Sequence, residues 1–359
     1  MKVDSIIVGQ GLAGSCLALA LAHRGKTFMV FDEPAKNHTT AVAPGLFNPI
    51  IGKGLTKTWM AETTFPFAEK FYQGIERQLG CRFYHPMPIY RPFISVEEQN
   101  EWMALSEGRL KSFIEKTYTS PAFGNFVNDP LGGILVKKSG YVNTVTLMSS
   151  VVGWLKKNGQ YRESHVDFDR LKIESGNVLY EDVEAKDIIF CDGVRVKKNP
   201  FFSWVYINCL KGETLTIQLT NPLNVIFNRG VYLVPTANPL VCLVGATYKP
   251  NDATENFTPE GEQELREKLD ALIKIPYTVE DRHWGIRPAV PDRRPVLGHH
   301  PLYKNVFLLN GMGTKGVTLA PYFATSLAAR LDQAGEIPDE VNIKRFKSLY
   351  SKFGFSSNV

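Results

Sequence analysis

Residues 5–33 read SIIVGQGLAGSCLALALAHRGKTFMVFDE and contain one complete structural unit. Residues 6–8 are a short β-branched run of the kind found in buried parallel strands. Three glycines follow in the spacing G-x-G-x-x-G. An apolar helical pattern then covers residues 12–24, before a second apolar run at 28–31. This order of strand, glycine turn, helix and strand predicts a dinucleotide-binding βαβ unit.

The glycines of this turn have distinct steric roles. Gly9 permits the tight turn, Gly11 lets a pyrophosphate approach the backbone, and Gly14 lets the helix pack on the strand. Leu12 and Ala13 lie in the first turn of the helix, whose free N–H groups and positive dipole end suit phosphate. We expect all five residues to contact the cofactor.

An acidic pair ends the second strand. Asp32, with Glu33 beside it, lies about twenty residues beyond the glycines, where a carboxylate binds ribose hydroxyls and disfavours a 2′-phosphate. The βαβ unit alone leaves NAD and FAD both open.

The composition is that of a globular protein. The chain has 359 residues, 44% hydrophobic and 21% charged, with a net charge of +5, so we expect one large domain or two interleaved ones. It has no uninterrupted apolar run of about eighteen residues, so we expect no transmembrane helix. Glycines interrupt the N-terminal apolar stretch, which we interpret as part of the fold. The five cysteines lack C-x-x-C spacing and are expected to be reduced and buried, in a cytoplasmic protein.

The α/β pattern returns in the middle of the chain and at its end, with β-rich segments between. The alternating and apolar runs of residues 204–248 predict an antiparallel sheet. Strand-like runs lie at 177–183, 187–191 and 306–309, and helical patterns at 58–80, 96–117, 140–158 and 259–274 and from about Val317.

Residues 284–320, WGIRPAVPDRRPVLGHHPLYKNVFLLNGMGTKGVTLA, resemble the C-terminal signature of the flavin-dependent D-amino acid oxidase superfamily, which includes glycine and sarcosine oxidases. Smaller matches are Lys211-Gly212-Glu213 and Gly245 with Tyr248. The resemblance covers nearly the whole chain and implies non-covalently held FAD. The matching residues are Trp284, Gly285, Arg287, Pro288, Asp292, Pro295, Gly298, Gly311, Gly313 and Gly316.

The resemblance also implies further residues around the cofactor. A small-residue segment would run beside the pyrophosphate and the isoalloxazine ring, Val166 would face the adenine, and a strand end at residues 191–193 would lie nearby. These residues are Thr39, Thr40, Ala43, Gly45, Val166, Cys191 and Gly193.

The second glycine loop, residues 311–316, opens the last helix. Its N–H groups and the helix dipole can stabilise negative charge at flavin N1 and C2=O, and Lys315 could add a full charge. The alternative is a plain glycine turn. The residues we assign to the cofactor here are Gly311, Gly313, Thr314, Lys315, Gly316 and Val317.

The fold class expected is α/β, or α+β overall. It combines a Rossmann-like FAD-binding domain with an interleaved substrate domain built on an antiparallel sheet. We assign residues 1–50, 138–200 and 284–359 to the FAD-binding domain. Residues 51–137 and 201–283 form the substrate-binding domain.

Arg287 matches the family arginine that holds the substrate carboxylate. A guanidinium suits bidentate binding, although a structural arginine bonded to loop carbonyls is the alternative. Lys315 is the next choice for the carboxylate. Tyr232 and Tyr248, on the predicted sheet, would either bind substrate or belong to the core.

The paired residues His299 and His300 lack further ligands at metal spacing. We expect them at the surface, with no metal site.

The leading hypothesis is an FAD-dependent oxidase or dehydrogenase. It would oxidise the C–N bond of a small amino acid or N-substituted glycine by hydride transfer to flavin N5. A nicotinamide-dependent reductase is a further possibility.

The alternative is a tRNA-modifying oxidase acting on carboxymethylaminomethyl-uridine. Residues 45–72 resemble the oxidase half of a bifunctional enzyme that completes 5-methylaminomethyl-2-thiouridine in tRNA. A basic path from pocket to surface would favour it, and Lys53, Lys57 and Lys315 could begin one.

Overall fold

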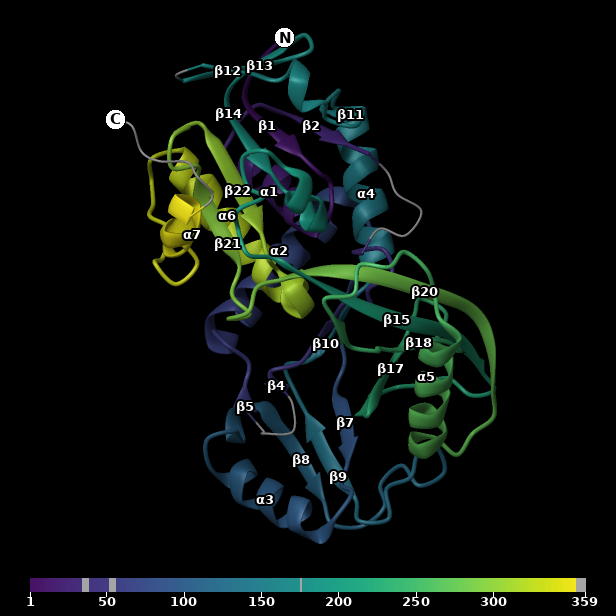
Figure 1. The fold of residues 1–359 in the computed structure, drawn as a ribbon. Coiled ribbons are helices and arrows are strands. Elements are labelled where there is room, and N and C mark those ends of the chain that lie inside the picture. The colour runs from purple at the N-terminus through teal and green to yellow at the C-terminus, as the bar shows by residue number, and fades with distance from the viewer. Residues whose placement is uncertain (34–38, 52–55, 175, 353–359) are drawn as a thin grey trace.

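The structure is a computed structural model that describes residues 1–33, 39–51, 56–174 and 176–352. Its first layer is a sheet of eight described strands in the order β11-β2-β1-β14-β13-β12, with β22 beside β14 and β21 beside β22 (Figure 1). The pairs β1–β2, β1–β14, β2–β11 and β14–β22 are parallel. The strands are β1 (Lys2–Val8), β2 (Phe28–Asp32), β11 (Tyr161–Glu163), β12 (Lys172–Glu174), β13 (Asn177–Tyr180), β14 (Val183–Phe190), β21 (Val296–His299) and β22 (Val306–Asn310).

Successive side chains along these strands point to opposite faces of the sheet, so the core is divided into two layers. On β1, Ile7 packs into one hydrophobic cluster while Ile6 and Val8 pack into another on the opposite face. The helices α1 (Leu12–His23) and α6 (Gly316–Leu331) contact each other over the Ile7 face. The expected Rossmann-like unit is therefore present.

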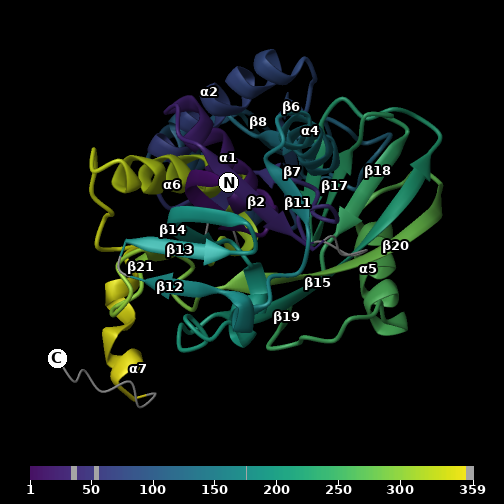
Figure 2. The same cartoon turned by 90° about the horizontal axis from the view of Figure 1, so that it is seen from above.

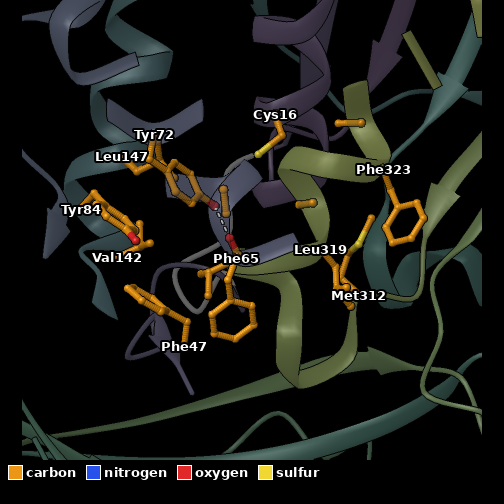
Figure 3. Close-up of a cluster of buried hydrophobic side chains, with 14 of the residues drawn as sticks. Cys16, Phe47, Phe65, Tyr72, Tyr84, Val142, Leu147, Met312, Leu319 and Phe323 are labelled. Carbon is orange, nitrogen blue, oxygen red and sulfur yellow. Dashed lines mark hydrogen bonds between the residues drawn. The ribbon is translucent and has the colours of Figure 1, made fainter. Parts of the chain in front are cut away.

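Helix α2 (Ala61–Leu79) completes that layer, together with α4 (Thr144–Lys157). Figure 3 shows its aromatic contacts, with Tyr72 on α2 pointing toward the start of α6. The hydroxyl of Tyr72 donates a hydrogen bond to the backbone oxygen of Val317 at 2.8 Å. This bond fixes the start of α6, where the second glycine loop ends.

The second sheet has nine described strands in the order β19-β15-β18-β17-β16-β7-β9-β8, with β20 beside β15. All its pairs are antiparallel except β7–β16. Figures 1 and 2 show β15 and β20 as two long neighbouring strands of this sheet that reach toward the first sheet. The strands are β7 (Ile89–Pro92), β8 (Ile114–Tyr118), β9 (Gly133–Val136), β15 (Asn208–Leu219), β16 (Ile226–Arg229), β17 (Val231–Pro235), β18 (Val241–Gly245), β19 (Lys249–Pro250) and β20 (Tyr277–Ala289).

The remaining elements pack around the two large sheets. Helix α5 (Pro259–Leu272) packs on the second sheet through buried leucines, and α3 (Val96–Glu107) contacts β8. In the described residues, no helix is long and apolar enough to cross a membrane. The other elements are β3 (Leu46–Phe47), β4 (Ile50–Ile51), β5 (Thr56–Lys57), β6 (Tyr84–Pro86), β10 (Gly140–Val142), α7 (Lys347–Lys352) and the 3₁₀ turns η1 (Lys111–Phe113), η2 (Phe168–Arg170), η3 (Gly193–Lys198), η4 (Gly313–Lys315) and η5 (Ile343–Phe346).

Three predicted boundaries are wrong. The helix expected over 96–117 ends at Glu107, and residues 114–118 form β8. Residues 140–142 form a strand, because Gly140 has a φ of +154° and Asn143 caps a helix that begins only at Thr144. Within the segment 204–248, the first strand begins at residue 208 and not at 204.

The two sheets are built from interleaved stretches of chain. Strands β1, β14 and β22 share the first sheet, although strands of the second sheet lie between them in the sequence. Strand β20 crosses the predicted boundary between residues 283 and 284, since it pairs with β15 along its length. The domain limits themselves stay a prediction.

Candidate active site

The first glycine turn packs tightly against helix α1. A Cβ placed on Gly14 would lie 1.9 Å from the backbone oxygen of Gly9, which has a φ of +96°. Gly11 is the N-cap and supplies no side-chain hydrogen bond to the helix. Only a 3.2 Å bond from Leu12 N–H to Thr40 Oγ1 is present there among the described residues. A helix start without a side-chain cap is an arrangement that suits a phosphate group.

The two acids after β2 have different surroundings. Asp32 is buried, and its Oδ1 accepts the backbone N–H of Gln10 in the glycine turn at 2.9 Å. Glu33 is exposed and pairs with Arg195 at 2.8 Å and with His165 at 3.0 Å. Asp32 is therefore the better placed of the two to face a ribose at the turn.

The second glycine loop lies against the first. A Cβ on Gly316 would be 3.0 Å from Leu12 Cδ2, so α6 begins beside the start of α1. Helix α6 also lacks a side-chain cap at Lys315. Gly313 has a φ of +54°, and a Cβ placed on it would come no closer than 4.0 Å to Pro288 O. The two uncapped helix N-termini thus border one region.

The remaining expected cofactor residues lie near these loops. Thr39 donates to Ile286 O at 2.8 Å, and Ala43 O accepts the Thr144 hydroxyl at 3.0 Å. Both bonds join the segment 39–45 to elements that border the glycine loops. A Cβ on Gly45, in the same segment, would be 1.8 Å from Val142 O, and one on Gly14 would be 3.4 Å from Cys191 Cβ. Gly193 begins η3, and Val166 and Val317 are buried.

A cavity of about 330 Å³ opens between the second sheet and the loop before α6. It is lined by all four predicted catalytic side chains together with Thr314. Its walls also include small and apolar residues of the segment 44–51. The structure therefore brings together residues that are far apart in the sequence: Tyr232, Tyr248, Arg287 and Lys315.

Arg287 lies on β20 opposite Leu210 of β15. Its Nη1 is buried without a hydrogen-bond partner, and no described acid forms an ion pair with it. A Cβ on Gly212 would lie 2.2 Å from this Nη1, so the glycine makes room for the guanidinium. Burial lowers the pKa of Arg287, opposed by the nearby hydroxyls of Tyr232 and Tyr248. A desolvated, unpaired guanidinium is a site for an anion.

The two tyrosines differ in position. Tyr232 on β17 has a buried hydroxyl with no partner, and burial raises its pKa to about 12. Gly245 leaves space for this hydroxyl, because a Cβ there would lie 2.4 Å from it. Tyr248 is 56% exposed in the loop between β18 and β19. The prediction of a sheet position is right for Tyr232 and wrong for Tyr248.

Lys315 supplies a second cation. Its Nζ donates to Thr58 Oγ1 at 3.2 Å and forms no ion pair with a described acid. Burial, together with the charge of Arg293, lowers the pKa of Lys315 to about 8. The ammonium is therefore partly neutral at slightly alkaline pH.

A third cation in this cavity, Arg91, was not among the predicted site residues. Arg91 on β7 lines the wall opposite the C-terminal loop and contacts Glu98. The one signal available was a charged residue within the apolar run 89–93.

The expectation of surface histidines is wrong for His300. Its side chain is buried among Phe202, Trp204 and Tyr303, and burial lowers its pKa to about 4. The Nδ1 of His300 accepts the backbone N–H of Leu302 at 3.2 Å, so its role is structural. The described residues contain no cluster that could hold a metal ion.

The model of the family described as FAD dependent oxidoreductase (DAO) matches residues 4–330. The chain is 24% identical to the bifunctional protein ThiO/ThiG of Nostoc sp. over 91% of its length and 52% of the relative's. It is 23% identical to glycine oxidase of Bacillus subtilis, covering 89% of this chain and 90% of that one. It therefore spans about half the length of the ThiO/ThiG relatives.

Two further similarities bear on fold and function. The tRNA 5-methylaminomethyl-2-thiouridine biosynthesis bifunctional protein MnmC of Idiomarina loihiensis is 22% identical over 96% of this chain and 59% of its own. The crystal structure of glycine oxidase from Bacillus cereus superposes with a TM-score of 0.76 at 19% identity, covering 93% of this chain and 96% of that chain. That superposition shows the fold alone.

Proposed function

The chain belongs to the FAD-dependent oxidoreductase (DAO) family, and we propose that it oxidises the C–N bond of a small amino acid or N-substituted glycine. One observation carries the proposal. Arg287 presents a buried guanidinium without a counter-ion to a cavity that is also lined by Tyr232 and Tyr248. A substrate carboxylate would supply the missing partner.

The residues at the glycine loops fit FAD. Two uncapped helix N-termini border one region, and the steric limits at Gly14 and Gly316 keep both helices close to it. We assign the pyrophosphate to the turn at residues 9–14, the adenosine ribose to Asp32 and the flavin to the loop 311–316. When bound, FAD supplies the two-electron acceptor for amine oxidation.

The cavity residues suit a neutral amine with a carboxylate. Arg287 would hold the carboxylate through two parallel hydrogen bonds. Tyr232, with its pKa raised to about 12, stays protonated at neutral pH and can donate to the substrate. The cations Arg287 and Lys315 also disfavour a nearby ammonium, so they favour loss of the amine proton to water. No described lining residue is an acid, and we assign no general base.

The test is anaerobic reduction of the flavin. The purified holoprotein is mixed with glycine, sarcosine, a panel of D- and L-amino acids, and simple amines that lack a carboxylate. We expect bleaching by an N-substituted glycine or small amino acid and none by the simple amines. Bleaching by amines without a carboxylate would contradict the role given to Arg287.

A tRNA-modifying activity is the second candidate, and similarity to MnmC supports it. Of the residues proposed to begin a basic path, Lys53 lies outside the described residues. Lys57 is paired with Glu62 at 2.6 Å. Lys315 faces the cavity, so the described lysines offer no outward path and the small substrate is preferred. Adding tRNA that carries carboxymethylaminomethyl-uridine to the panel separates the two. A cytoplasmic location stays a prediction.

A further inference from the structure

The cavity has a basic end that the proposed chemistry does not use. Across the second sheet, Tyr90 of β7 is in register with Phe227 of β16, which places Arg91 beside Asn228. Asn228 pairs with Tyr232, and Tyr232 with Gly245. Arg91, Asn228, Tyr232 and Gly245 all line the cavity. They form one row of residues that runs from Arg91 toward the strands that carry Arg287.

Arg91 is incompletely paired in this position. Its Nη2 contacts Glu98 Oε1 at 3.4 Å, whereas Arg229 Nη1 contacts the same oxygen at 2.7 Å. Its Nε is buried without a partner, and its guanidinium lies 6.0 Å from the centre of the Trp102 ring. Two arginines thus share one carboxylate, and the group of three keeps a net positive charge.

Arg91 and Arg287 lie at separate ends of the cavity. Four strand spacings separate β7 from β15, over which the Arg287 guanidinium lies, and this corresponds to roughly 19 Å between backbones. Arg229 and Glu98 are the charged groups that act on Arg91, and Arg287 is not among them. A single carboxylate could not bridge the two guanidinium groups unless both side chains extended toward each other.

We propose that the Arg91 end is a second anion subsite, and that the substrate is a carboxymethyl amine whose other nitrogen substituent carries a second carboxylate. This inference rests on the proposed function, in which Arg287 takes the first carboxylate. No described lining residue is acidic, and Asn228 adds a polar group between the two cations. The cavity therefore selects an elongated amino diacid over a neutral amine of the same length.

The test uses a series of N-carboxymethyl ω-amino acids of increasing chain length, starting from iminodiacetate. Each is compared with the N-alkylglycine of equal length. Flavin reduction by the holoprotein is measured anaerobically for wild type, Arg91→Met and Arg91→Lys. The matched control is Arg229→Met, which removes the other partner of Glu98 but no lining residue. FAD content and melting temperature establish that each variant folds.

We expect the wild type to prefer a diacid longer than iminodiacetate. Arg91→Met should lower kcat/KM for that diacid by about tenfold to a hundredfold and leave the N-alkylglycine unchanged, with partial rescue in Arg91→Lys. Arg229→Met should reduce the preference less than Arg91→Met does, because it frees Glu98 to pair with Arg91 but keeps the Arg91 guanidinium at the cavity wall. Equal losses for both substrates in Arg91→Met, or no preference for a diacid in wild type, would overturn the subsite. So would reduction by modified tRNA without reduction by any free diacid.

A second readout does not depend on turnover. Straight-chain dicarboxylic acids and monocarboxylic acids of equal length are titrated into the holoprotein and followed by calorimetry. We expect tighter binding of the dicarboxylic acids in wild type and loss of that advantage in Arg91→Met. If no amine reduces the flavin but this pattern is found, the proposed function fails and the subsite stands. If an amine reduces the flavin but dicarboxylic acids bind no more tightly than monocarboxylic acids, the proposed function stands and the subsite fails.

Discussion

A guanidinium buried without a counter-ion is unfavourable, and Arg287 is held in that position by its neighbours. Gly212 clears the space that the guanidinium occupies, and the backbone pairing of β20 with β15 fixes where the side chain starts. The unfavourable burial is offset when an anion binds. A site of this kind has its electrostatics arranged before the ligand arrives.

Replacing Arg287 tests that arrangement. Arg287→Ala should weaken substrate binding or raise the barrier to flavin reduction by about 2–5 kcal/mol, because a carboxylate would be left in the cavity without its partner. Arg287→Lys should recover part of the loss, since it keeps the charge but loses bidentate geometry. The measurement is the rate of flavin reduction against substrate concentration. Loss of FAD in the Ala variant, or unchanged kinetics, would make Arg287 a structural residue.

Lys315 predicts a pH dependence. Its pKa of about 8 is below the usual value, so the ammonium is charged below pH 8 and is lost as pH rises through that value. If this charge supports flavin reduction, the rate for wild type relative to Lys315→Arg should fall above pH 8. Lys315→Met should be slow at every pH and lack that transition. A constant ratio of wild type to Lys315→Arg between pH 6 and 10 would argue against the role.

Residues whose roles depend on their own turn or strand could be predicted from the sequence, and residues whose roles depend on distant segments could not. The glycines of both loops could be predicted, because the backbone conformation or close packing of each turn requires a residue without a side chain. Arg91 could not, since it reaches the cavity through the register of strands that are distant in the sequence. The burial of His300 depends on aromatic residues of the segment 201–204, which the sequence does not place against it.

At the scale of elements, the pairing of β15 with β20 connects the two sheets. An isolated bridge between Ala289 and Met312 joins the end of β20 to the second glycine loop. The strand that carries Arg287 is therefore fixed at both ends, by β15 along its length and by this loop. A change within the strand pair should alter substrate binding while FAD remains bound.

Gly212→Ala tests this connection. The added methyl group would lie 2.2 Å from Arg287 Nη1, so the guanidinium must move. We expect a higher KM for a carboxylate substrate, with FAD content unchanged. The control is Gly153→Ala in α4, where nothing lies within 4 Å of the added carbon. That variant should be neutral, or more stable by about 0.5–1 kcal/mol. An unchanged KM for Gly212→Ala would show that substrate binding does not depend on the present position of the Arg287 guanidinium.

The sequence predicted element types better than their limits. The amphipathic pattern of 259–274 and the apolar pattern of 12–24 correspond to α5 and α1 within two residues. The expectation over 96–117 failed beyond Gly108, because residues 114–118 pair with β9 at the edge of the second sheet. That pairing is a tertiary contact, and it outweighs local helical preference.

At the scale of the whole molecule, the interleaving of the chain makes the first sheet depend on distant segments. Ile188 of β14 pairs with Ile6 of β1 on one side and Val306 of β22 on the other. The two glycine loops follow β1 and β22, so both depend on this one set of three strands. FAD bound across the two loops should stabilise the set as a unit.

Native-state hydrogen exchange tests the interleaved arrangement. In low denaturant, amides of β1, β14 and β22 should reach one common opening free energy, because β14 pairs with both of the other two strands and links them. Adding FAD to the FAD-free protein should raise that energy for all three together, as expected for a ligand that binds the folded form alone. Strands β16 and β17 serve as the internal comparison, since they pair only within the second sheet. If β22 opened independently of β1, two sequential units would describe the molecule better. The predicted limits at residues 138–200 and 284–359 would then be wrong.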